Sequence, residues 1–249
     1  MPLEPIHIIN GIFSLAVICC FTIVGLKIAL IYRKNKDKVY LLVGLAWMLL
    51  ASPWYGSGTS FIVALFDGTQ RGLMDYELVY FTLVVPLIPI ALTILVTSIT
   101  EIMFRPYRWK IRLIFLIFAI VMEILFIVYM IYFDSSLIII VETPVNATYS
   151  RAIMYYILIS ALIVLLIGIL LARSSIQLGT AEGKIRGYFL LIAFVLFVLG
   201  ALFDSLLKDL IKQINILILL PRSLLIMSAF CFYLGFITPK FIKERLKKA

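Results

Sequence analysis

Glu123 is the residue whose type and position most clearly suggest chemistry. It lies near the middle of an apolar stretch, residues 111–133, with no Lys or Arg within ten positions on either side. A carboxyl group at mid-membrane depth costs several kcal/mol, so this one should face a bundle interior in its protonated form. Two interpretations stay open. Glu123 is a proton-sensitive switch or ligand contact, or it is a structural acid that hydrogen-bonds a Ser, Thr or Tyr on another helix.

A second set of candidate residues interrupts the apolar stretch at 39–66, where Pro53 is followed by two glycines within the next five positions. A proline removes a backbone donor and clashes with the preceding helical turn. Prolines also occur in the stretch at 77–104. Broken helices near the midplane form ligand sites in some membrane proteins, although an ordinary proline kink is the alternative interpretation. With Glu123, the candidate ligand-binding residues are Pro53, Trp54, Tyr55, Ser57 and Pro86.

Asp204 and Arg222 lie near the facing ends of two consecutive apolar stretches. Consecutive helices are usually neighbours, so the two side chains should fall at similar depth and form an ion pair. A binding site is the other interpretation. The tripeptide Asn146-Ala147-Thr148 is an Asn-x-Thr sequon in an expected outer loop, which makes Asn146 a candidate glycosylation site.

Enzymatic chemistry is not expected. The single histidine, His7, can neither build a metal-ligand cluster nor serve a distant nucleophile such as Ser57. The three cysteines all lie within apolar stretches, so no disulfide framework is expected. A retinal Schiff base requires a lysine in mid-helix, and the last apolar stretch, residues 216–238, contains none. We therefore expect no metal, no cofactor and no catalytic site.

The elements that must position these residues are apolar helices. The chain of 249 residues is 64% hydrophobic and only 14% charged, with a mean hydropathy of +1.15. Such a composition excludes a water-soluble domain and a disordered chain. A membrane-spanning helix needs about 20 mainly apolar residues. Seven stretches qualify, which predicts an all-α bundle and a single domain, residues 1–249, with spans at about 8–32, 39–66, 77–104, 111–133, 152–172, 187–207 and 216–238.

The basic residues predict the topology. Of the 22 Lys and Arg residues, 17 fall in or beside alternate loops and in the C-terminal tail. Cytoplasmic loops carry an excess of basic residues, so the N-terminus should lie outside and the C-terminus in the cytoplasm of a multi-pass cell-membrane protein. The basic, amphipathic tail at 239–249 suits an anionic lipid surface. Besides the lipid bilayer, we expect a cytoplasmic protein partner at the basic loops and tail, with self-association left open; nucleic acid is not expected.

Several short stretches resemble a large set of seven-helix membrane proteins from archaea, particularly the Asgard group. The stretches are Phe21–Lys27, Ser52–Trp54, Gly187–Phe194, Gly200–Asp204 and Phe232–Pro239. The last two spans also resemble the seven-helix sensor region that precedes some histidine kinases, although this chain ends after the seventh helix without a kinase. These resemblances imply a seven-helix fold and a sensor-like role.

Three functional hypotheses follow. The first is a seven-helix, receptor-like sensor that binds a small or lipid-like ligand within the bundle and signals through its basic cytoplasmic loops. The second is a small transporter or proton-linked permease that uses the broken second span and Glu123. The third is a non-signalling, lipid-interacting scaffold.

Overall fold

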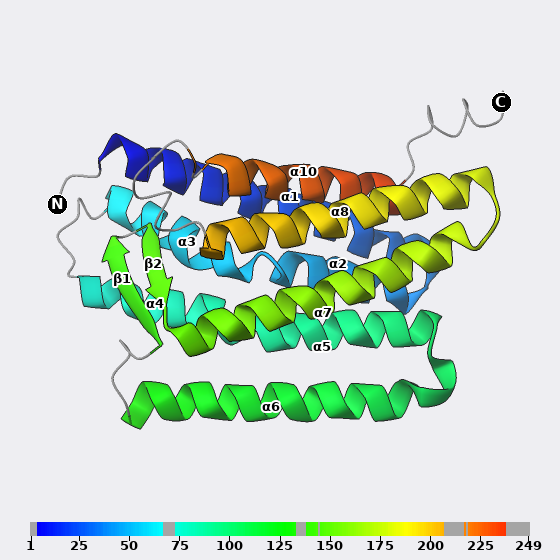
Figure 1. Ribbon diagram of the computed structural model, residues 1–249, viewed down its shortest axis with the longest axis horizontal. Helices are drawn as coiled ribbons and strands as arrows, with labels where there is room; N and C mark the ends of the chain where they lie inside the picture. The colour runs from blue at the N-terminus through cyan, green and yellow to red at the C-terminus, as the bar shows by residue number, and fades with distance from the viewer. Residues whose placement is uncertain are drawn as a thin grey trace.

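The computed structural model describes residues 4–66, 73–132, 138–143, 145–206, 217 and 219–237, and these form one elongated bundle of helices (Figure 1). The elements are α1 (Pro5–Asn35), α2 (Lys38–Leu49), α3 (Ser52–Phe66), α4 (Leu73–Val84), α5 (Leu87–Ile102), the 3-10 turn η1 (Arg105–Tyr107), α6 (Arg108–Tyr132), β1 (Ile139–Thr143), β2 (Asn146–Tyr149), α7 (Arg151–Ile176), α8 (Ala181–Leu206) and α10 (Leu219–Phe236).

The helices have the length and composition of membrane spans. Within the described residues, six helical segments are long and apolar enough to cross a bilayer. The pair α2 and α3 adds another if it counts as one span bent by 54° at its break. The protein is therefore a membrane protein built as a bundle of apolar helices. The predicted tail at 239–249 lies outside the described residues.

Local signals in the sequence account for the helix boundaries. Lys36 ends α1 in the left-handed conformation, with φ of 57°, and its N–H donates to the Tyr32 carbonyl. Asp37 then caps α2, because its side chain accepts a hydrogen bond of 2.9 Å from the Val39 N–H. Gly179 supplies the positive φ, 73°, at the tight turn between α7 and α8. A few residues thus specify the α1–α2 and α7–α8 turns.

The core is a stack of aromatic rings at the centre of the bundle. The Trp47 ring lies between the rings of Phe21 and Phe232, with centroids 4.8 and 3.5 Å away and nearly parallel planes. Phe194 meets Trp47 edge-on at 5.9 Å. Since these residues come from α1, α2, α8 and α10, the stack joins the beginning and the end of the chain into one core.

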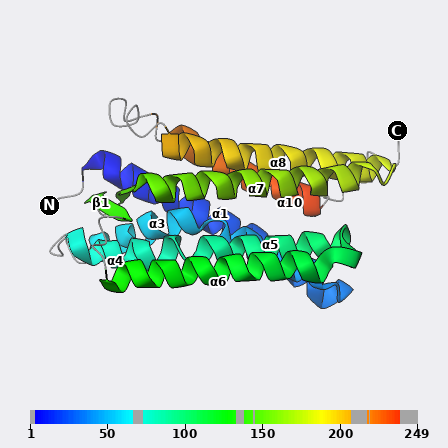
Figure 2. The ribbon, with the colours of Figure 1, turned by 60° about the horizontal axis from the view of Figure 1, so that its bottom comes forward.

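Helix α6 lies at the edge of the bundle (Figures 1 and 2). It packs mainly against α5, while much of its surface is exposed, including Leu113, Ile117, Ile124 and Tyr132. Lipid would cover such a surface in a membrane. Ring contacts of Phe118 and Phe126 with Tyr156 connect α6 to α7.

The segment between α6 and α7 differs from the plain outer loop that we expected. Strands β1 and β2 pair antiparallel, with Ile139 opposite Tyr149 and Ile140 opposite Thr148. The run of β-branched residues from Ile138 to Val141 is the sequence signal for such a hairpin. The hairpin caps one end of the helix bundle, where the N-terminus also lies (Figure 1).

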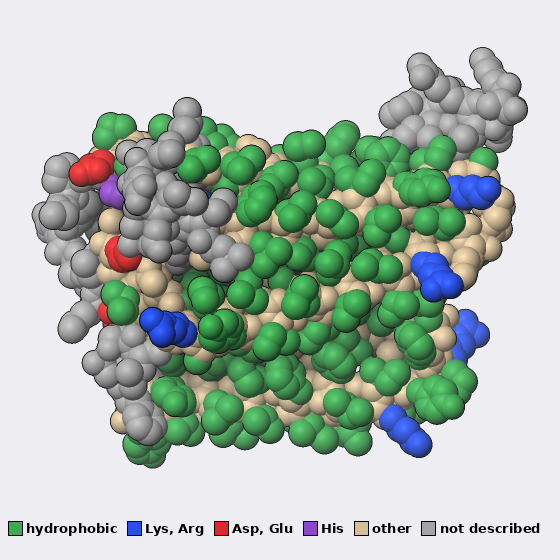
Figure 3. All heavy atoms as spheres, in the orientation of Figure 1, with side chains coloured by type: hydrophobic (Ala, Val, Ile, Leu, Met, Phe, Trp, Pro, Cys, Tyr) green, Lys and Arg blue, Asp and Glu red, His purple; other side chains and the backbone are tan. Residues whose placement is uncertain are grey.

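Charge divides the bundle into two ends. Most of the Lys and Arg side chains visible in Figure 3 gather at the end away from the hairpin, and the acidic side chains visible on this face lie at the hairpin end. We call these the basic end and the hairpin end. Glu101 and Glu182 lie at the basic end, in ion pairs with Arg112 and Arg186. The sides of the bundle between them are covered with hydrophobic side chains, as expected for a surface that faces lipid (Figure 3).

Candidate ligand-binding site

The break between α2 and α3 determines the geometry of the candidate site. Pro53 has no N–H, so the Leu49 carbonyl loses the donor that it would have in an unbroken helix. The Tyr55 hydroxyl reaches back across the break and donates a hydrogen bond of 2.8 Å to the Met48 carbonyl. The break is thereby held in a defined bent form, not left as a loose joint.

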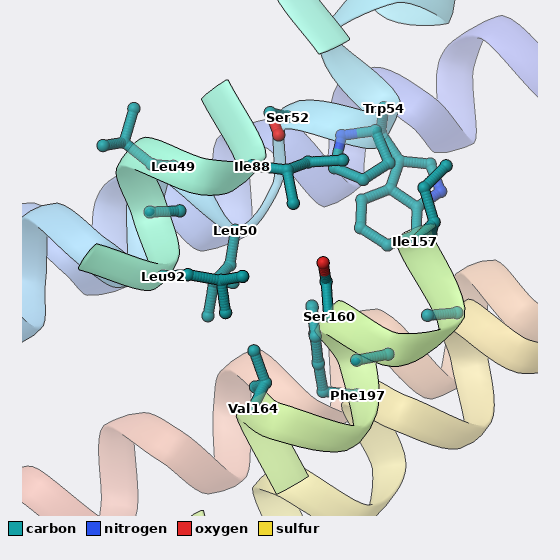
Figure 4. A pocket seen from close by; sticks show the side chains of 14 residues that line it. Leu49, Leu50, Ser52, Trp54, Ile88, Leu92, Ile157, Ser160, Val164 and Phe197 are labelled. Atoms are coloured by element: carbon teal, nitrogen blue, oxygen red, sulfur yellow. The ribbon is translucent and has the colours of Figure 1, made fainter. Parts of the chain in front are cut away.

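A small cavity of about 30 Å³ lies beside this break (Figure 4). Its walls come from the α2–α3 break, α5, α7 and α8, and they include Pro53, Trp54, Leu92, Ser160 and Phe197. Hydrocarbon makes up nearly all of the lining, with hydroxyl groups only at Ser52 and Ser160. A cavity of this size holds about two water molecules. The described form of the protein therefore has a small, almost entirely apolar space beside the break.

Trp54 connects the cavity to an ion pair between the buried Arg222 and Asp204, whose side chain is 25% exposed. Its ring lines the cavity and its Nε1 donates a hydrogen bond of 3.1 Å to Asp204 Oδ2. Arg222 Nη1 lies 3.4 Å from the same oxygen, and the Arg222 guanidinium carbon lies 5.8 Å from the centroid of the Trp54 ring. Arg222 is only 5% exposed. The two charged residues that we expected to pair are thus brought together, and Trp54 joins them.

Further polar contacts extend from the ion pair to the hairpin. Arg222 Nη2 lies 3.5 Å from Asn10 Oδ1, and Asn10 Nδ2 donates a hydrogen bond of 3.2 Å to the Val145 carbonyl between β1 and β2. Ser57 Oγ donates to Ser14 Oγ at 3.1 Å. These contacts form a buried polar network that links α1, α3, α8, α10 and the hairpin.

Tyr149 on β2 lies close enough to the ion pair to feel its charges. Burial of its hydroxyl raises the pKa of Tyr149, the Asp204 carboxylate raises it further, and the Arg222 guanidinium opposes the rise. The hydroxyl therefore stays uncharged at neutral pH. Titration of Tyr149 plays no part in the network.

Glu123 lies apart from this site. It is on α6, near Tyr156 of α7, and it is not among the residues that line the cavity. Its Oε1 is buried without a hydrogen-bond partner among the described residues. The structure therefore does not bring Glu123 and Trp54 into one cavity.

Three of the other predicted residues belong to the cavity or the network, and two do not. Pro53 and Trp54 line the cavity, and Ser57 belongs to the polar network. Pro86 stands at the start of α5 and is not part of the cavity wall. Tyr55 is half-buried and stabilises the break.

The sequon residue Asn146 lies at the start of β2. Its amide donates a hydrogen bond of 3.2 Å to Glu142 Oε2, and the Thr148 hydroxyl donates one of 2.8 Å to Glu142 Oε1. Both polar residues of the sequon therefore share one carboxylate. Attachment of a glycan to the Asn146 amide would compete with this contact.

The candidate residues chosen from the sequence did not include Asn10, Ser52 or Ser160. Asn10 could have been found, because an amide within an apolar stretch is costly unless it has partners. Ser160 carried no signal, because serine is common in spanning helices and only the fold shows that it lines a cavity. Among the described residues, no three His, Cys, Asp or Glu side chains are grouped as metal ligands would be.

Comparisons with protein-family models, with curated proteins and with solved structures gave no match.

Proposed function

We propose that this protein is a receptor-like membrane sensor that binds a small, apolar or lipid-like ligand at the break between α2 and α3. The observation that carries the proposal is the cavity lined by Trp54, the residue that also bonds to the Asp204–Arg222 pair. A ligand that enters the cavity contacts the Trp54 ring and thereby acts on a buried charge network.

The physical path of the signal runs from Trp54 to the last two helices. The ion partners are on α8 and α10, which pack against each other along their length. Displacement of the Trp54 ring weakens its bond to Asp204, so the pair must rearrange or lose stabilisation. Because α8 begins near the basic end, a shift of α8 changes the surface that we propose to face the cytoplasm.

The orientation in this proposal follows the charge. The basic end faces the cytoplasm of a multi-pass cell-membrane protein, and the hairpin end faces outward. A cytoplasmic partner would then meet the side chains at the basic end, which include Arg33, Lys36, Arg105 and Arg186.

A transporter is supported less well. The broken span favours it, but the intramembrane acid does not, because Glu123 stands outside the cavity and away from the Asp204–Arg222 network. A proton route would need these groups to be joined by other polar side chains. We therefore keep the sensor as the proposed function.

Quenching of tryptophan fluorescence by 1-bromododecane tests the proposal. Bromine quenches an indole only at close contact, and Trp54 is 1% exposed whereas Trp109 is 72% exposed. In lipid nanodiscs, a Trp109→Phe background removes the ring that lipid-dissolved bromine reaches from outside. We expect saturable quenching in this background. Ala161→Leu, which fills the cavity wall, should abolish it, and Ala119→Leu on α6 should not.

Sensing requires a second measurement on the same protein. Spin labels at Lys36→Cys and Lys184→Cys, in a background without the native cysteines, report the distance between the α1–α2 turn and the start of α8. The proposal predicts that 1-bromododecane changes this distance. Quenching without any change in distance contradicts the sensor, and absence of saturable quenching contradicts ligand binding itself.

A further inference from the structure

The cavity contains two hydroxyl groups in an otherwise apolar wall. Ser52, at the break, is 0% exposed, and its Oγ has no hydrogen-bond partner among the described residues. Ser160 comes from α7 and is also buried. In Figure 4 the Ser160 hydroxyl points into the space bounded by Ile88, Leu92 and Ile157, and Ser52 lies across that space.

The broken helix leaves a backbone acceptor without its helical donor beside the cavity. Leu49 and Pro53 both line the cavity, and the Leu49 carbonyl has lost its helical donor because Pro53 has no N–H. A buried backbone oxygen without a donor costs free energy comparable to a lost hydrogen bond. The wall thus contains one hydroxyl group without a partner among the described residues, Ser52 Oγ, which can both donate and accept.

The cavity is unsuited to a charged group. None of the side chains that line it is charged. The nearest charges in the site, Asp204 and Arg222, lie beyond the Trp54 ring and already neutralise each other. An ionised head group placed here would lose its hydration without gaining a counter-charge, and such a transfer is strongly unfavourable.

The volume limits what can enter. About 30 Å³ accommodates a hydroxyl group and the carbon next to it, but not an elongated chain. Leu49 and Pro53 are only half-buried, so the cavity reaches the surface of the bundle beside them. A chain attached to the bound group would leave there, toward lipid.

We infer that the ligand is a neutral, membrane-dissolved amphiphile with a single hydroxyl group, of the long-chain alcohol type. Its hydroxyl lies between Ser52 and Ser160, and its chain extends past Pro53 into the bilayer. This inference rests on the proposed function, because it names the ligand class of the same cavity.

Competition between chain-matched probes tests the inference. In the Trp109→Phe background, dodecane, 1-dodecanol and dodecanoate are titrated against bound 1-bromododecane, with concentrations expressed as mole fraction in the nanodisc. We expect 1-dodecanol to restore the fluorescence at about five- to tenfold lower mole fraction than dodecane, the advantage of one or two hydrogen bonds. Dodecanoate should compete less well than 1-dodecanol.

Serine variants test whether the preference for 1-dodecanol over dodecane arises in the cavity. Ser52→Ala and Ser160→Ala should each reduce the advantage of 1-dodecanol, and the double variant should remove it. Ser228→Ala is the matched control, because Ser228 is a buried serine whose hydroxyl bonds to the Ala193 carbonyl outside the cavity. This control should keep the full advantage. Each Ser→Ala change removes only one oxygen atom, so we expect all of these variants to fold.

Each outcome has a distinct meaning. Equal competition by dodecane and 1-dodecanol overturns the hydroxyl claim while cavity binding stands. Strongest competition by dodecanoate overturns the argument from charge. If 1-dodecanol keeps its advantage over dodecane in the Ser52→Ala, Ser160→Ala double variant, the hydroxyl of the ligand binds elsewhere and the inference is overturned. If 1-bromododecane itself does not quench saturably, the proposed function fails first.

Discussion

The ion pair between Asp204 and Arg222 allows the most quantitative prediction. Arg222 is 5% exposed, and its charged partner among the described residues is Asp204, at 3.4 Å. Removing one member of a buried pair leaves an uncompensated charge and typically costs about 3–5 kcal/mol. Asp204→Asn keeps the shape and one acceptor for Trp54 Nε1, so its cost should lie near the lower bound, about 3 kcal/mol.

The double variant should cost much less than the sum. Arg222→Met with Asp204→Asn removes both charges and leaves no buried charge unpaired. What remains lost is the contact of Arg222 with Asn10 and part of the bond to Trp54, about 1–2 kcal/mol. Arg222→Met alone leaves the Asp204 carboxylate unpaired, but this side chain is 25% exposed, so the cost should be smaller, about 2 kcal/mol. With about 3 kcal/mol for Asp204→Asn and about 1–2 kcal/mol for the double variant, a coupling free energy of about 3–4 kcal/mol between the two sites is expected.

Equilibrium unfolding in mixed micelles with increasing SDS, followed by far-UV circular dichroism, measures these costs. The pair Glu182 and Arg186 is the control, because its atoms are 2.6 Å apart but both side chains are partly exposed on one helix. Its coupling should stay below about 1 kcal/mol. If Asp204 and Arg222 prove additive within about 0.5 kcal/mol, the buried pair does not stabilise the protein and the reasoning is wrong.

Three further predictions concern packing, the isolated acid and topology. Gly44→Ala should destabilise the bundle by about 1–3 kcal/mol, because the new Cβ would lie 2.4 Å from the Gly25 backbone oxygen. Gly58→Ala should cost less, because its Cβ would meet side-chain ends, with Ile18 Cδ1 the nearest at 2.4 Å. Equal costs in the same unfolding assay would contradict this reasoning. Glu123→Leu should raise stability by about 1 kcal/mol, since it removes a buried oxygen without a partner; a comparable loss would show that the acid has one. Lys36→Cys and Asn146→Cys, each in a background without native cysteines, should react with a membrane-impermeant thiol reagent from opposite sides of the membrane, and labelling from one side would contradict the orientation.

The helical, membrane-bound character of the fold could be predicted from composition, because about 20 apolar residues in a row have few other stable solutions. The break at Pro53 was also predictable, since proline removes a backbone donor wherever it occurs. The hairpin was missed, because a short β-branched run beside a loop is ambiguous when every neighbouring segment is apolar.

The site was predictable only in part. The spacing of Asp204 and Arg222 indicated two helix ends at similar depth, and the structure brings the two side chains together. The link through Trp54 was not predictable, because it depends on how α3 rotates against α8. Glu123 attracted attention by its residue type, yet a sequence does not tell which face of α6 meets other helices, and that face decides whether an acid joins a site.

Photolabelling tests most directly the claim that the break between α2 and α3 binds a ligand from the membrane. The probe is a long-chain primary alcohol with a diazirine on a chain carbon close to the CH2OH group. Mass spectrometry maps its adducts on the full chain in nanodiscs. We predict adducts on segments 49–54 and 157–164 that excess 1-dodecanol prevents and that Ala161→Leu abolishes. Adducts confined to exposed side chains such as those of α6, unaffected by 1-dodecanol and by Ala161→Leu, would contradict the claim.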